Sequence, residues 1–94
     1  MKKPHPKILI VEDEAPAVRV MTLALEREGF EVRAAQNASA ALALIHDLQP
    51  DVLVADYLLP GMSGIDLLRY SLRRYPDLPV VMITGHGDER IAVE

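Results

Sequence analysis

Acidic residues and one hydroxyl group follow apolar runs at three separate places in this sequence. Glu12 and Asp13 come directly after one apolar run, and Asp56 comes directly after another. Thr84 follows a third run. If these runs are neighbouring parallel strands, the side chains meet at the carboxyl edge of the sheet, where ligands bind. Carboxylates about 4 Å apart repel by roughly 4 kcal/mol at an effective dielectric constant of about 20, so this group favours a counter-ion or a raised pKa. A hard cation is the simpler of these two answers.

The chemistry of such a group is that of phosphoryl transfer. An aspartate can act as a carboxylate nucleophile, and a neighbouring hydroxyl can bond a phosphoryl oxygen. Mg²⁺ takes oxygen ligands and often uses only one or two carboxylates together with a phosphate. The sequence therefore predicts a phosphoryl site with Mg²⁺ held beside it.

Four short apolar runs predict the strands that position these residues. Each run is rich in Val, Ile or Leu and is bounded by charged residues, Gly or Pro. They are Lys7–Val11, Glu31–Ala35, Val52–Ala55 and Val80–Ile83. Three segments with helical periodicity separate them, and strands that read as continuous apolar runs are typical of sheets covered on both faces. We therefore expect an α/β fold with a doubly wound parallel sheet.

Residues that favour helix ends support this alternation. Pro16 suits the first turn of the first helix, and Gly29 lies just past its end. Asn37 or Ser39 precedes the second helix, and Ser63 precedes the third.

Composition excludes several classes of protein. The 94 residues carry a net charge of −4, and most of the basic residues are scattered along the chain, which argues against binding of nucleic acid. No cysteine is present, so disulfides and thiolate metal sites are excluded. The first apolar run is too short for a signal peptide, and no run approaches the length of a membrane span. We expect a cytoplasmic protein.

Three segments resemble the signatures of a known family. Residues 8–14 (ILIVEDE), 56–64 (DYLLPGMSG) and 81–85 (VMITG) are similar, in this order, to the motifs of the receiver domains of two-component response regulators. The resemblance covers the chain from Lys7 onward. It implies one receiver domain over residues 1–94, with the flavodoxin-like fold and the strand order 2-1-3-4.

The resemblance also implies a role for each matched residue. Asp56 resembles the phospho-acceptor, Asp13 the direct Mg²⁺ ligand and Glu12 an acidic partner that acts through water. Leu58 resembles the residue whose backbone carbonyl binds Mg²⁺, and Thr84 resembles the switch hydroxyl. The implied partners are a sensor histidine kinase or a phosphotransfer protein that donates the phosphoryl group, and an output domain or partner, as in transcription regulation, that the switch controls.

The sequence departs from the family's pattern near its end. The family has a fifth strand, a lysine after it and a fifth helix, none of which this sequence includes, so we expect a domain truncated at its C-terminus. The segment Asp88–Glu94 predicts the start of a fourth helix, because acidic residues stand in its first turn. Val80–Ile83 would then be an edge strand, and the apolar face of the first helix would be partly uncovered, which predicts self-association.

Other interpretations remain open. Taken singly, Glu12 and Asp13 could be a helix N-terminal charge cluster, and Asp56 could be a turn residue. A receiver-like module that binds partners without being phosphorylated is the first alternative. A Mg²⁺-dependent phosphohydrolase is the second, although such enzymes usually need a second acid at the position that Leu58 occupies. Tyr57 and His86 are left without an assigned role.

Overall fold

The computed structural model describes residues 5–59, 61–84 and 90–93, although the side chains of residues 84 and 90–93 lie outside the description. Strands and helices alternate through most of the chain, as the apolar runs predict. The elements are β1 (Lys7–Val11), α1 (Ala15–Arg27), β2 (Glu31–Ala35), α2 (Ala38–Leu48), β3 (Val52–Asp56), α3 (Gly64–Arg74), β4 (Val80–Thr84) and β5 (Arg90–Val93).

The strands form one sheet in the order β2-β1-β3-β4-β5. The first four strands are parallel, which confirms the predicted doubly wound sheet with the order 2-1-3-4. In the register, Val11 of β1 pairs with Ala55 of β3, so both strands end at the same edge. Asp56 pairs with Ile83 of β4, one residue before the end of that strand.

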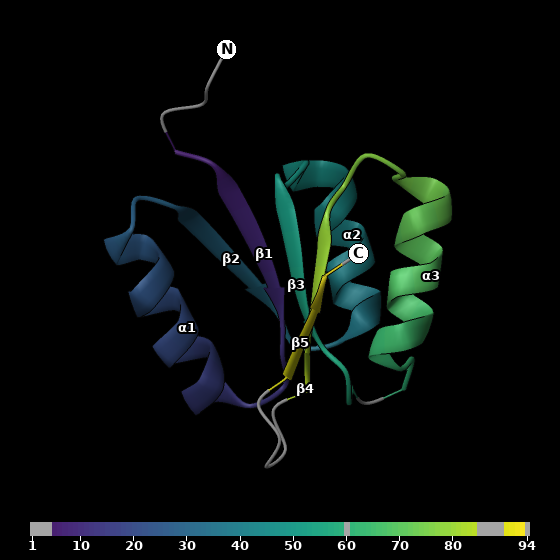
Figure 1. Cartoon of the computed structure of the whole chain (residues 1–94), viewed down its shortest axis with the longest axis horizontal. Helices are drawn as coiled ribbons and strands as arrows, with labels where there is room; N and C mark the ends of the chain where they lie inside the picture. The colour runs from purple at the N-terminus through teal and green to yellow at the C-terminus, as the bar shows by residue number, and fades with distance from the viewer. Residues whose placement is uncertain (1–4, 60, 85–89, 94) are drawn as a thin grey trace.

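Helices cover the two faces of the sheet, with α1 on one side and with α2 and α3 on the other (Figure 1). On the α1 side, Met21 and Leu25 pack on a small cluster of strand residues: Ile8, Ile10 and Val32. The larger cluster lies under α2 and α3 and is built from residues such as Leu9, Leu53 and Leu67. The central strands are therefore buried by aliphatic packing, which holds their carboxyl ends in fixed positions.

The predicted helix ends agree with the structure. Pro16 lies in the first turn of α1, and Gly29 follows the C-cap of that helix with a φ of +96°. Of the two candidates for the second helix, Asn37 is the N-cap, and its side chain accepts a hydrogen bond from the N–H of Ala40 at 2.8 Å. Ser63 caps α3 by accepting from the N–H of Asp66.

The prediction of a helix near the end of the chain is wrong for Arg90–Val93. These residues form β5, which runs antiparallel to β4, so β4 is not the edge strand that the sequence predicted. The physical reason is that a helix of only a few residues gains little, because its first turn fixes several residues for one hydrogen bond. The open backbone of β4 instead offers a complete row of donors and acceptors.

Helix α1 contributes no fully buried side chain, although it is rich in apolar residues. Val20 is 67% exposed and Leu23 is 63% exposed. The sequence predicted an apolar face on this helix wider than packing on the sheet alone would use. Among the described residues, that excess apolar surface is present.

Ser71 of α3 carries the one buried side-chain oxygen that lacks a hydrogen-bond partner among the described residues. Its side chain is fully buried. An unpaired buried hydroxyl costs about 1–3 kcal/mol, so we expect Ser71→Ala to raise the free energy of unfolding by about 1 kcal/mol. Urea unfolding measures this change. Ser63→Ala is the control, because loss of its cap bond should lower the free energy of unfolding by about 1 kcal/mol. A loss of stability in Ser71→Ala would contradict the assignment.

Candidate functional site

The carboxyl edge of the parallel sheet brings together the acidic residues that the sequence singled out. Glu12 and Asp13 follow β1 directly, and Asp56 is the last residue of β3, the neighbouring strand. The N–H of Glu12 donates to the carbonyl oxygen of Ala35 at 3.0 Å, so the ladder to β2 continues one residue past β1. This extension holds the backbone of Glu12 against the sheet.

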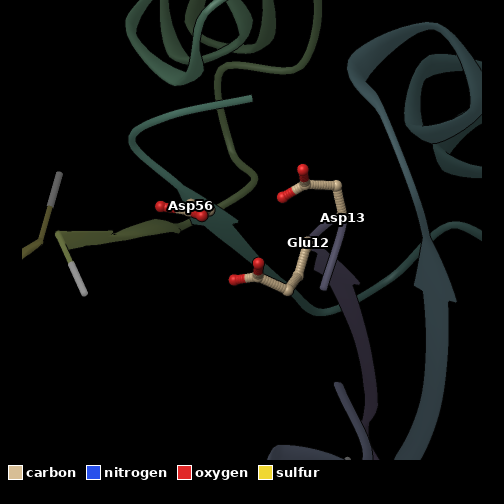
Figure 2. A group of neighbouring side chains, drawn as sticks. All are labelled: Glu12, Asp13 and Asp56. Atoms are coloured by element: carbon tan, nitrogen blue, oxygen red, sulfur yellow. The ribbon is translucent and has the colours of Figure 1, made fainter. Parts of the chain in front are cut away.

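The three side chains point toward a common region at that edge (Figure 2). One carboxylate oxygen from each of Glu12, Asp13 and Asp56 lies within 4.8 Å of the other two. Asp56 is 4% exposed and Glu12 is 7% exposed, whereas Asp13 is exposed. The site is therefore an acidic group with a buried base and one side open to solvent.

Backbone groups fix β3 at its end. The N–H of Leu58 donates to Oδ1 of Asp56 at 3.2 Å, which orients the carboxylate. The N–H of Tyr57 donates to the carbonyl oxygen of Ile83 at 2.8 Å. The main chain around Asp56 is thus held by β4 on one side and by its own turn on the other.

Burial raises the pKa of Glu12 from 4.5 to about 7. A hydrogen bond from the backbone N–H of Glu14, at 3.2 Å, opposes this shift. The negative charges of Asp56 and Asp13 raise the pKa further, as does a side-chain hydrogen bond with Asp56. Glu12 therefore holds a proton more readily than an exposed glutamate does, because the ionised form would be desolvated and would face the charges of Asp56 and Asp13.

This shift predicts how stability depends on pH. The folded-state pKa of Glu12 lies above the unfolded value, so its contribution to stability is present below about pH 4.5 and is lost as pH rises through about 7. Stabilisation by added Mg²⁺ should grow over the same range, because the cation competes with the proton. Urea unfolding of wild type and Glu12→Gln, with EDTA or with Mg²⁺, tests this. A difference between the two proteins that does not change with pH would contradict it.

The residues present fit a hard divalent cation. All three groups of the acidic cluster are carboxylates, which are the ligands that Mg²⁺ and Ca²⁺ prefer, and no softer ligand type belongs to the cluster. The charges of Asp56 and Asp13 add to burial in raising the pKa of Glu12, and a bound cation would offset these charges. The group could therefore bind a metal ion.

The other two predicted site residues are Leu58 and Thr84. Leu58 lies two residues after Asp56, with its N–H on the carboxylate and its side chain 53% exposed. The backbone of Thr84 ends β4, one residue beyond the partner of Asp56, so Thr84 belongs to the same edge. The side chain of Thr84 and the whole of His86 lie outside the described residues.

Two features of the site were missed by sequence reasoning. A cavity of about 410 Å³ is lined by residues that include Glu12, Asp13, Val18, Leu23 and Ala34. Gly64, the first residue of α3, packs directly against the end of β3. The one signal available in the sequence was a glycine directly after the expected helix cap Ser63, where its low helix propensity needs a reason.

Comparison with known proteins places this architecture in a family. The model for the response regulator receiver domain matches residues 8–94. The phosphate regulon transcriptional regulatory protein PhoB of Pseudomonas aeruginosa is 45% identical over 85 residues, which cover 87% of this chain and 37% of that protein. The transcriptional regulatory protein FixJ of Rhizobium meliloti is 42% identical over 85 residues, covering 90% and 42%.

Solved structures give the same result. A response regulator receiver domain protein from Clostridium thermocellum superposes with a TM-score of 0.82 at 33% identity, and the match covers 88% of this chain and 68% of that one. The chain spans about two fifths of the length of the curated relatives named above. The sheet order, the acidic edge and these matches agree, and the chain belongs to the family of two-component response regulator receiver domains.

Proposed function

We propose that this receiver domain accepts a phosphoryl group on Asp56 and acts as a phosphorylation-controlled switch for an output domain or partner. The observation that carries the proposal is the convergence of three carboxylates, with Asp56 nearly buried at the end of a central strand. A carboxylate held in this way is a nucleophile with a fixed direction of attack. Receiver domains are signalling modules, so one phosphoryl group per chain is the expected product rather than steady turnover.

The transfer forms one bond and breaks another. A carboxylate oxygen of Asp56 attacks the phosphorus of the donor, and the bond from phosphorus to the leaving group breaks, giving an aspartyl phosphate. With a phosphohistidine donor the imidazole leaves and takes up a proton. With a small acyl phosphate a carboxylate leaves. The N–H of Leu58 keeps Asp56 oriented during this step.

The cofactor that we propose is Mg²⁺, held by the carboxylates of Asp13 and Asp56 and by the backbone carbonyl of Leu58, with Glu12 acting through water. When bound, Mg²⁺ would offset negative charge on the phosphoryl oxygens. Binding would also favour the ionised form of Glu12, whose pKa is raised to about 7 without metal. Asp13 is the exposed member of the group, so it can meet an ion that still keeps several waters.

Thr84 is the proposed switch residue, since its hydroxyl would bond an oxygen of the phosphorylated Asp56. Support comes from the backbone register, in which Asp56 pairs with Ile83 and Thr84 is the next residue of β4. A move of Thr84 toward the phosphoryl group would carry the end of β4 with it. This would transmit the state of Asp56 to the outer part of the sheet.

The experiment that tests the function is incubation of the protein with acetyl phosphate and Mg²⁺, followed by intact mass measurement. We expect one added phosphoryl group per chain, formed in a single burst. A binding module would gain no mass. A phosphohydrolase would release phosphate continuously, but Leu58 stands where a second acid would be needed, and its side chain is apolar and half exposed.

The proposed partner that supplies the phosphoryl group is a sensor histidine kinase or a phosphotransfer protein. The relatives PhoB and FixJ are named as transcriptional regulatory proteins, and transcription regulation is our proposal for the protein that carries this domain. Binding to nucleic acid by this segment is not expected, because its net charge is −4. In the described part of the chain, every helix is too short or too polar to cross a bilayer. We propose that it works in the cytoplasm.

Self-association of the 94-residue chain is a further expectation. Val20 and Leu23 expose most of their surface on α1, and full burial of an aliphatic side chain of this size contributes about 1.5–3 kcal/mol. Sedimentation velocity over a wide range of concentrations measures the effect. Val20→Thr combined with Leu23→Gln should shift the chain toward the monomer, and a wild type that stays monomeric at all concentrations would contradict the expectation.

A further inference from the structure

Gly64 lies so close to the main chain of Asp56 that any other residue at position 64 would bring its Cβ atom against that main chain. A methyl group built on Gly64 would overlap the carbonyl oxygen of Asp56 and would lie 2.8 Å from the Cα of Tyr57. It would also lie 2.8 Å from Cε of Met82. Two of these three neighbours are backbone atoms of the acceptor segment, which cannot move aside as a flexible side chain can.

Conformation does not explain the glycine at this position. A positive φ is found at Gly29 and Gly61 but not at Gly64, so an alanine could adopt the same backbone there. Alanine would even favour the helix that begins at this residue, by about 1 kcal/mol. The glycine is therefore explained by the short distance between the start of α3 and the backbone of Asp56.

A hydrogen bond also joins the start of α3 to the segment that follows Asp56. The N–H of Gly64 donates to the carbonyl oxygen of Tyr57 at 3.0 Å, so the start of α3 is tied to the residue that follows Asp56. Tyr57 in turn donates to Ile83 of β4. The acceptor segment is clamped between β4 and the first residue of α3, and Leu67 anchors that helix in the core.

We infer that Gly64 is a positioning residue for phosphoryl transfer, because the absence of a Cβ sets where the main chain of Asp56 lies relative to Glu12 and Asp13. The inference rests on the proposed function of Asp56. With alanine at position 64, α3 or the end of β3 must shift, and the separation of the carboxylates changes. A misplacement of about 1 Å can reduce a reaction rate on the order of a hundredfold.

The test compares two Gly→Ala variants, one at the first residue of α3 and one in the segment just before that helix. Gly64→Ala introduces the contact without backbone strain, whereas Gly61→Ala introduces strain, with a φ of +78°, but meets no atom within 4 Å. We expect Gly64→Ala to lower the labelling rate with acetyl phosphate on the order of tenfold or more and to weaken Mg²⁺ binding. Gly61→Ala should lower stability while leaving the labelling rate of the folded protein near that of wild type. Amide chemical shifts of residues 56 and 57 report the displacement directly.

The double variant Gly64→Ala/Met82→Ala identifies which neighbour of the added methyl group affects the labelling rate. It removes the contact with Met82 but leaves the backbone contacts, so labelling should remain slow. Recovery of the wild-type rate would overturn the inference, as would equal labelling in Gly64→Ala and wild type. Each glycine variant is also made in the Ser71→Ala background to gain stability, and failure of Gly64→Ala to fold there would show a role in folding instead. Absence of labelling in wild type would refute the proposed function of Asp56 itself.

Discussion

Asp56→Asn should abolish phosphorylation, with no added mass after incubation with acetyl phosphate and Mg²⁺. An amide has nearly the shape of the carboxylate but is a very poor nucleophile, so the change removes the chemistry and keeps the packing. The N–H of Leu58 can still donate to the remaining side-chain oxygen, so the turn after β3 should be preserved. We expect the rate of labelling to fall by several orders of magnitude, to the background level.

The control for this variant is Asp66→Asn, which removes the same charge from an exposed position in the first turn of α3. Its labelling should match that of wild type. Stability supplies a second check, because loss of the charge of Asp56 removes one of the effects that raise the pKa of Glu12. Asp56→Asn should therefore be at least as stable as wild type at neutral pH without metal. A phosphate retained in Asp56→Asn would refute the assignment.

Asp13→Ala should lose site-specific Mg²⁺ binding, with an affinity at least about tenfold below that of wild type, equivalent to about 1.4 kcal/mol. Removal of this carboxylate takes one of the three oxygens that lie within 4.8 Å of one another. The remaining carboxylates are Asp56 and Glu12, whose pKa is raised to about 7, so two ligands do not offset the cost of dehydrating the ion. A chemical-shift titration with Mg²⁺ measures both affinities.

Glu14→Ala is the matched control for Asp13→Ala. It removes one negative charge from the adjacent position, but the side chain of Glu14 is exposed and does not belong to the acidic group. Its backbone N–H, which bonds Glu12, is unaffected by the substitution. Equal losses of affinity in the two variants would indicate general attraction by charge rather than coordination, and equal affinities in Asp13→Ala and wild type would contradict the role of Asp13.

Much of the fold could be predicted from the sequence, because the strands are continuous apolar runs with clear boundaries. The predicted bounds of β1 and β2 are those observed. Strands β3 and β4 each extend one residue further, to Asp56 and Thr84, since backbone pairing rather than hydropathy decides where a strand ends. The convergence of the acids was predictable for a related reason, because parallel strands bring their carboxyl ends to one edge.

The remaining features depend on tertiary contacts that local patterns do not encode. The segment Arg90–Val93 pairs with β4, although the acidic residues that precede it in the sequence, Asp88 and Glu89, favour the start of a helix. The pKa of Glu12 depends on the burial of its side chain and on two carboxylates. Asp13 is adjacent in the chain, whereas Asp56 is distant. The contact of Gly64 with Asp56 spans a turn, and only the folded structure shows how close the two backbones are.

The most direct test of the central claim is to trap the phosphorylated residue chemically. Borohydride reduces an acyl phosphate to an alcohol, so an aspartyl phosphate becomes homoserine, which peptide mass spectrometry can locate. The protein is incubated with acetyl phosphate and Mg²⁺, reduced and digested. We predict homoserine at position 56 alone, dependent on the phosphodonor and reduced when Mg²⁺ is chelated. Homoserine at another acidic residue, or phosphate retained on a histidine with Asp56 unmodified, would contradict the account.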